Sequence, residues 1–151
     1  MASFMVGCSS TPITLAPIGP NPTGVKSMAS EGELQVFSRM VGRSEGNNPD
    51  WHQHSDYYIY DLHKKFIKRV RNNVGYYAKA PCLVALPTGN YLVKARAKNY
   101  FWVYVPVTIR PGETTEVHLD TAWKIPSDAS TNEVVYFPDG YPAGWKNSGT
   151  K

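Results

Sequence analysis

The sequence predicts an all-β protein, and more specifically a β-sandwich. Apolar side chains recur at every second position through residues 81–120, which is typical of strands with one buried face. Turn signals divide this stretch: Leu-Pro-Thr-Gly, Lys-Asn and Arg-Pro-Gly-Glu. The composition agrees, because 12 Gly, 12 Pro and 13% aromatic residues favour many turns and an all-β class over a helical one. The 151 residues suffice for one domain with a sizeable core.

Four strands are expected inside this stretch: 82–86, 91–97, 100–109 and 114–119. In the second, small and branched apolar residues alternate with cationic ones, so that this strand presents one face to the core and one to water. Pro111-Gly112 predicts the tight turn before the fourth, because proline presets φ and glycine tolerates a positive φ.

The strand 100–109 carries the candidate binding surface. Its alternation assigns Phe101 and Val103 to the buried face. The opposite face then presents three aromatic rings: Tyr100, Trp102 and Tyr104. Such a strip can stack sugar rings, as in a carbohydrate-binding module, or be covered by a protein partner. The C-terminal segment could equally close it, since that segment carries Trp123, Tyr136 and Phe137.

The same stretch resembles a known family. The pattern L-P-x-G-x-Y-x-V-x-A-x-A-x-x-Y, followed by P-V-x-I-x-P-G-x-T-T-x-V-x-L-D, is similar to carboxypeptidase regulatory-like domains. Those are seven-stranded, prealbumin-like (transthyretin-like) Greek-key sandwiches, which serve as accessory modules in exported bacterial proteins. The resemblance implies this fold and no catalytic residues. Asn99 departs from the glycine usual at its position, but asparagine also tolerates a left-handed turn.

Further strands flank this core. An opening strand is expected over 33–41, a long polar loop over 42–54, and a hairpin from strands 57–60 and 66–70. After Asp120 the family pattern stops. Pro138-Asp139-Gly140 predicts one short hairpin within a C-terminal extension that packs on the sandwich.

The first 30 residues are expected to be a separate, weakly ordered arm. Phe4 to Ser10 looks like the end of a bacterial lipoprotein signal, in which Cys8 is lipidated. Residues 9–30 are rich in Pro, Ser, Thr and Gly, a composition typical of an extended tether. The alternative for Cys8 is a disulfide with Cys82. The predicted organisation is therefore a start and tether over 1–30, a sandwich over 31–120 and an extension over 121–151.

The positive charge is mild. A net charge of +4 accompanies one dense cluster within the predicted hairpin: Lys64, Lys65, Lys68, Arg69 and Arg71. Aromatic residues are not interleaved with these cations in the way that a nucleic-acid platform requires, so the cluster indicates a solvated basic surface and no nucleic-acid partner.

The sequence gives little indication of a catalytic site. His52 and His54 could share a metal ion if the loop were extended, with Asp50, Asp56 or His118 as a third ligand. A His-x-His pair in a loop without fixed further ligands is more often a pair of solvated polar residues, and no cofactor is expected. Cys82 lies on an apolar strand with nothing to activate it, and no nucleophile-elbow or phosphate-binding motif occurs.

These observations predict a non-catalytic structural or interaction module of a bacterial cell-envelope lipoprotein. Its partner would be a protein or glycan of the envelope, with membrane contact through the lipid anchor alone. The protein would be periplasmic, anchored at the outer membrane, or secreted. The alternative is a carbohydrate-binding module that uses the aromatic strip together with Trp51 on the long loop.

Overall fold

The computed structural model describes residues 12–22, 30–42, 52–72 and 80–147. These residues form thirteen strands and one 3₁₀ turn, η1 (Thr131–Glu133), and they contain no α-helix. The larger sheet consists of β1 (Ile13–Thr14), β2 (Ile18–Gly19), β6 (Tyr57–Tyr60), β7 (Phe66–Val70), β9 (Gly89–Arg96), β10 (Trp102–Ile109), β12 (Val134–Tyr136) and β13 (Pro142–Lys146). The smaller sheet consists of β3 (Glu31–Phe37), β8 (Leu83–Pro87) and β11 (Thr114–His118). A separate pair is formed by β4 (Met40–Gly42) and β5 (His52–His54).

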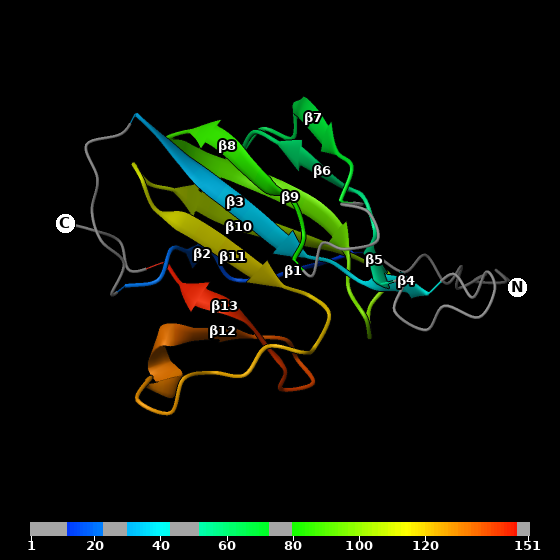
Figure 1. Ribbon diagram of the computed structural model, residues 1–151, viewed down its shortest axis with the longest axis vertical. Helices are drawn as coiled ribbons and strands as arrows, with labels where there is room; N and C mark the ends of the chain where they lie inside the picture. The colour runs from blue at the N-terminus through cyan, green and yellow to red at the C-terminus, as the bar shows by residue number, and fades with distance from the viewer. Residues whose placement is uncertain (1–11, 23–29, 43–51, 73–79, 148–151) are drawn as a thin grey trace, which may run out of the picture.

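The two sheets pack as layers, with β3, β8 and β11 lying across β9 and β10 (Figure 1). Strands run in the order β12-β13-β2-β10-β9-β6-β7 in the larger sheet, where β1 also pairs with β10. The smaller sheet has the order β11-β3-β8. The all-β sandwich predicted from the alternation is thereby confirmed, although its strands outnumber the seven expected.

The core lies between the layers and follows the predicted alternation. Every second residue of β10 from Val103 to Ile109 is at most 2% exposed. Val93 and Ala95 on β9 meet Leu34 and Val36 from β3 in the same buried cluster. Because the period of a strand is two, the residues between these face outward, and on β9 and β10 they are mostly polar or aromatic, with Leu92 and Pro106 as the aliphatic exceptions.

The tether predicted over 9–30 is wrong for the part that the structure describes. Leu15 and Ile18 are 6% and 0% exposed, and β1 and β2 pair in parallel with β10. Residues 12–22 thus cover an edge of β10 that would otherwise leave backbone groups unpaired. The composition misled because a few apolar residues among prolines and threonines suffice for two very short strands.

The C-terminal segment is part of the larger sheet. β13 pairs with β12 on one side and with β2 on the other, and Ala143 lies in the core at 0% exposed. The predicted hairpin is present, with its turn at Gly140, where φ is +94°. It extends the larger sheet at its edge through β13 and β2, whereas the sequence predicted an extension that packs on the sandwich.

The opening strand expected over 33–41 is divided in two. β3 belongs to the smaller sheet, and β4 leaves it to pair with β5. Ser38 marks the break: it is fully buried, and its hydroxyl donates to the Ser55 carbonyl at 2.6 Å. Met40, the first residue of β4, is 38% exposed. The end of the predicted loop, residues 52–54, is strand β5, while residues 43–51 lie outside the description.

No helix in the described residues is long and apolar enough to cross a membrane.

Candidate functional site

The outer face of the larger sheet carries a continuous array of rings and cations. Cross-strand register places Trp102 opposite Arg96, and Tyr104 opposite Lys94. On the far side of β9, Tyr58 is opposite the same Lys94. Residues directly opposite one another project to the same side of a sheet, close enough to interact. We call Tyr58, Lys64, Lys94, Arg96, Trp102 and Tyr104 together the aromatic–cationic face.

The cations of this face lie over its rings. The guanidinium carbon of Arg96 is 4.9 Å from the centroid of Trp102. Lys94 Nζ is 5.3 Å from the centroid of Trp102 and 5.7 Å from that of Tyr104. These distances are within the range of cation–π attraction, which holds the charged groups above the sheet while leaving them partly in water. The Tyr58 ring completes the cluster, 6.1 Å from Trp102.

Lys64 reaches the same face from the turn between β6 and β7. Its Nζ is 5.3 Å from the Tyr104 centroid. Lys64 has a positive φ of 63°, and the turn is fixed by Asp61, whose carboxylate accepts hydrogen bonds from the backbone N–H groups of His63 and Lys65. Strands β6, β9 and β10 contain no Asp or Glu, so positive charge predominates on the array; Asp56, just before β6, is ion-paired to Arg69 on β7.

The aromatic strip predicted from sequence is only partly present. Trp102 and Tyr104 share the outer face as expected, and both are half-buried. Tyr100 does not join them, because it stacks on Phe137 at a centroid distance of 5.1 Å and packs against the core. Phe101, expected inside, is 57% exposed. Residues 99–101 lie in a bend, so β10 begins at Trp102, two residues later than predicted.

The described part of the C-terminal segment, residues 121–147, does not close over Trp102 and Tyr104. Among its aromatic residues, Phe137 reaches Tyr100, whereas Trp123 stacks on His118 at 4.5 Å and meets Trp145 edge-on. The covering expected from sequence is wrong in this respect. Within the described chain, the neighbours of Trp102 are Tyr58, Phe101 and the two cations.

In the part of the chain that the structure describes, no further metal ligand gathers around His54. His54 is 8% exposed, and its Nδ1 donates to the Ser38 carbonyl at 2.6 Å. No group of three His, Cys, Asp or Glu residues that could hold a metal is found within the described ranges. His52 lies two residues before His54 on the same strand, β5. Of the suggested third ligands, Asp56 is ion-paired to Arg69 at 2.7 Å, and Asp50 lies outside the described residues.

Three other predictions concern residues that the structure does not describe. Cys8 and Trp51 lie outside it, so lipidation, the Cys8–Cys82 disulfide and the role of the long loop remain predictions. Cys82 precedes β8 and is partly exposed, although a buried strand position was expected. Its backbone N–H donates to the side-chain oxygen of Asn72, a fully buried residue that also bonds Val36 and Ser38.

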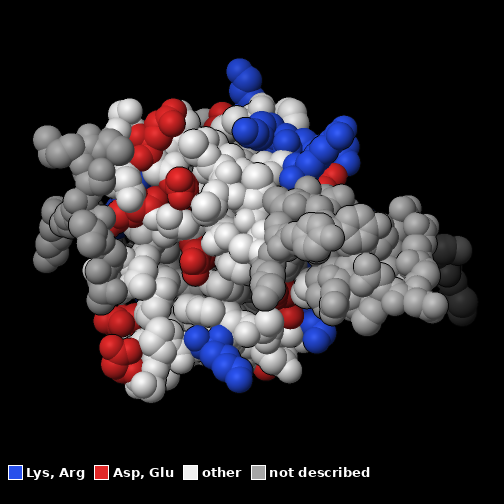
Figure 2. All heavy atoms as spheres, in the orientation of Figure 1, with Lys and Arg blue, Asp and Glu red and all other residues white. Residues whose placement is uncertain are grey.

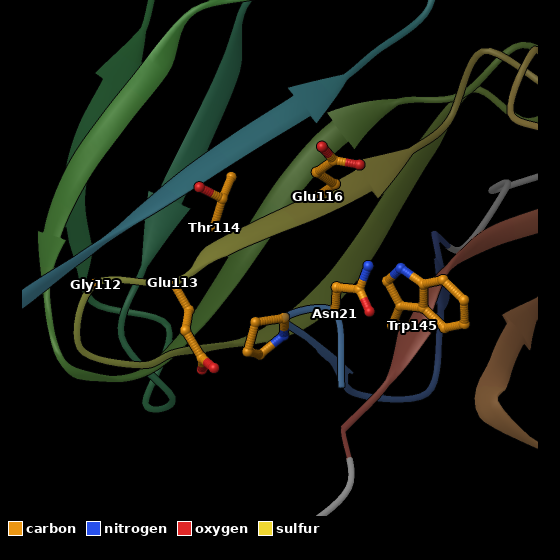
Figure 3. A pocket seen from close by; sticks show the side chains of 7 residues that line it. Asn21, Gly112, Glu113, Thr114, Glu116 and Trp145 are labelled. Atoms are coloured by element: carbon orange, nitrogen blue, oxygen red, sulfur yellow. The ribbon is translucent and has the colours of Figure 1, made fainter. Parts of the chain in front are cut away.

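A pocket of about 320 Å³ lies away from the aromatic–cationic face, between β2, β11 and β13. Figure 3 shows Asn21 beside Trp145, with Glu116 on β11 and Glu113 on the turn that precedes it. Carboxylates and an indole wall suit hydrogen-bond donors or a cation better than an anion. Sequence reasoning missed this pocket because its walls come from distant segments, one of them taken for a tether.

Behind the pocket runs a row of five rings: His54, Phe37, His118, Trp123 and Trp145. His118 is stacked between Phe37 and Trp123 at 4.5 Å on each side. Its Nε2 is 3.2 Å from the Glu116 carboxylate. That hydrogen bond lowers the pKa of Glu116, against the opposing effect of partial burial. The row joins the smaller sheet to the C-terminal segment.

Comparisons with protein-family models, characterised proteins and solved structures found no significant match. The resemblance to carboxypeptidase regulatory-like domains therefore stays a prediction.

Proposed function

We propose that this chain is a non-catalytic interaction module whose aromatic–cationic face binds an acidic carbohydrate polymer. The observation that carries the proposal is the placement of Lys94 and Arg96 over the rings of Trp102 and Tyr104. The cations supply attraction for carboxylate or sulfate groups, and the rings supply flat apolar surface for the sugars between them.

The charge of the face distinguishes an acidic from a neutral polymer. The sugar-stacking strip expected from sequence would offer bare rings, but here Arg96 and Lys94 occupy space above Trp102. A neutral sugar would have to displace these cations, whereas an acidic one would form ion pairs with them. The absence of Asp and Glu from β6, β9 and β10 favours the same class of ligand.

The shape of the site favours a polymer. The face extends across three neighbouring strands, β6, β9 and β10, and its side chains on these strands are half-buried, while Lys64 on the turn is exposed. Successive rows of the sheet repeat the same combination of ring and cation, at Trp102 with Arg96 and at Tyr104 with Lys94. A repeating surface matches a ligand with repeating charged units, because several weak contacts can then act together.

Location in a bacterial cell envelope is part of the proposal and has separate support. It rests on the lipoprotein-like sequence from Phe4 to Ser10 around Cys8. Mass spectrometry of the native protein tests it: a diacyl or triacyl group on an N-terminal Cys8 is expected, and an unmodified Cys8 in the mature protein would contradict it.

The binding proposal is tested by calorimetric titration with polygalacturonate and with neutral dextran. Binding to polygalacturonate is expected, and it should weaken as salt increases. Arg96→Gln and Trp102→Ala should each weaken binding by about tenfold or more, the effect of losing one charge-assisted contact or one buried ring. Lys124→Gln, which removes an exposed cation elsewhere, is the matched control and should bind unchanged. Equal binding of dextran, or unchanged affinity in Arg96→Gln, would contradict the proposal.

A further inference from the structure

The hairpin of β6 and β7 projects an exposed apolar tip. Eight large apolar side chains are exposed in the described residues, and three of them fall within the short run 62–67: Leu62 at 57%, Phe66 at 56% and Ile67 at 43%. Every residue from Leu62 to Arg69 is exposed. Such a concentration on one element indicates a contact surface, whereas single exposed apolar residues need no explanation.

The same hairpin holds the densest positive charge of the chain. Residues 61–69 contain four Lys or Arg against one Asp. Figure 2 shows the blue side chains gathered over this hairpin, while red ones are scattered over the smaller sheet. Asp61 does little to oppose the cations, because its carboxylate is engaged by the backbone of the turn at 2.8 and 2.9 Å.

The hairpin is also held in shape. The backbone N–H of Asp61 donates to the carbonyl of Lys65 at 2.9 Å, and Phe66 meets Tyr60 edge-on at 5.9 Å. A register shift between Ile59 and Tyr60 leaves Ile67 without a directly opposite residue on β6. The apolar side chains are thus presented by a fixed turn at the end strand of the sheet, which β7 forms.

We propose that this hairpin docks onto an anionic lipid bilayer. Leu62, Phe66 and Ile67 would enter the boundary between headgroups and acyl chains. Lys65 and Lys68 would remain at the level of the negatively charged headgroups, as long cationic side chains do at membrane surfaces. The positive charge of the tip complements such a surface, and the apolar side chains gain a non-aqueous environment that a soluble anion does not offer.

This inference is independent of the proposed polymer binding. The polymer site uses the outer face of β9 and β10, with Lys64 folded down onto Tyr104. The membrane contact uses the tip residues Leu62, Phe66 and Ile67 with Lys65 and Lys68. Variants of one surface should therefore leave the other activity unchanged.

Sedimentation with lipid vesicles tests the docking. The full chain carries Cys8→Ser, so that no acyl group contributes. It should sediment with phosphatidylcholine vesicles that contain phosphatidylglycerol and remain largely soluble with pure phosphatidylcholine. The double variant Leu62→Ser, Phe66→Ser should lose this binding. Leu83→Ser is the matched control, because Leu83 is 53% exposed on β8, and it should sediment as the parent does.

The charge contribution is measured on the same vesicles. Lys65→Gln and Lys68→Gln should each weaken binding about fivefold, whereas Lys124→Gln should not. Circular dichroism checks that each variant remains folded, and the polygalacturonate titration of each hairpin variant should be unaltered. Equal sedimentation with both vesicle types, or unchanged sedimentation of Leu62→Ser, Phe66→Ser, would overturn the proposal. If Arg96→Gln lost only its binding to polygalacturonate, the membrane-docking proposal would be unaffected.

Discussion

Lys94 illustrates how one residue acquires a role from its register. On β9 it is opposite Tyr104 on one side and Tyr58 on the other. Its ammonium group can therefore lie over a ring of β10 without leaving the sheet surface. An ordinary exposed lysine would be mobile in water. Here the neighbouring rings restrict it, which lowers the entropy cost of binding an anion.

At the residue scale, the Glu116–His118 pair predicts an acid-sensitive contribution to stability. The pKa of Glu116 lies below its ordinary value of 4.5 in the folded chain, first because of the hydrogen bond to His118. A depressed folded-state pKa stabilises the fold above the unfolded value, and this stabilisation is lost as pH falls through the folded value. Glu116→Gln should therefore lower the free energy of unfolding at neutral pH, with the difference shrinking at about pH 3.

Urea unfolding of both chains at the two pH values measures this effect. His118→Phe keeps an aromatic ring between Phe37 and Trp123 but removes the hydrogen-bond donor. In that background Glu116→Gln should have no pH-dependent effect. A difference between Glu116→Gln and the parent that is the same at both pH values would show that the hydrogen bond to His118 is not its source.

At the scale of elements, β13 owes its place to a buried tryptophan. Trp145 is 7% exposed and meets Trp123 edge-on at 5.5 Å. Gly144 beside it approaches closely, since a Cβ there would lie 2.7 Å from a methyl group of Ile18 and 3.0 Å from the Glu116 carbonyl. The large ring of Trp145 and the absence of a side chain at Gly144 together let β13 pair with β2 while β13 lies against β11.

We expect Trp145→Ala to lower the free energy of unfolding by about 3–5 kcal/mol, the cost of a cavity where a large buried ring was. Tyr141→Ala, in the same segment but 44% exposed, should cost less than about 1 kcal/mol. Thermal and denaturant unfolding measure both. Equal, small effects would mean that the C-terminal segment is only loosely attached to the sandwich.

At the scale of the whole molecule, three segments that the sequence separates share one core. Ile18 from the N-terminal segment, Val107 from the central stretch and Ala143 from the C-terminal segment belong to the same buried cluster. Because the three segments share one core, the stability of each depends on the other two: removing any one segment exposes the core residues of the others. The described chain should therefore unfold as one cooperative unit.

Ile18→Ala tests this cooperativity. Ile18 is fully buried, so the substitution should cost about 2–5 kcal/mol and shift the entire unfolding transition. Ile13→Ala, at a partly buried position on β1, should cost less. Tryptophan fluorescence and far-ultraviolet circular dichroism should give coincident curves for each variant. If Ile18→Ala left stability unchanged, residues 12–22 would be the tether that their composition suggests.

The sequence specified the strands whose alternation is long and regular. β6, β7 and β10 begin or end within two residues of their predicted limits, and the outward position of Trp102 and Tyr104 was predicted correctly. The prediction failed where few residues decide the outcome. The bend at 99–101 shifted Phe101 and Tyr100, and the break at Ser38 divided the opening strand.

What the sequence by itself determined is the all-β class and the division of β9 and β10 into an apolar and a polar face, because a period of two fixes which side each residue takes. Which cations lie over Trp102, which short segments complete the sheet, and which distant residues enclose the pocket at Trp145 were decided only in the tertiary structure. Those features depend on the pairing of strands that are far apart in the chain, and such pairing is set by the packing of the whole core, which no local pattern contains.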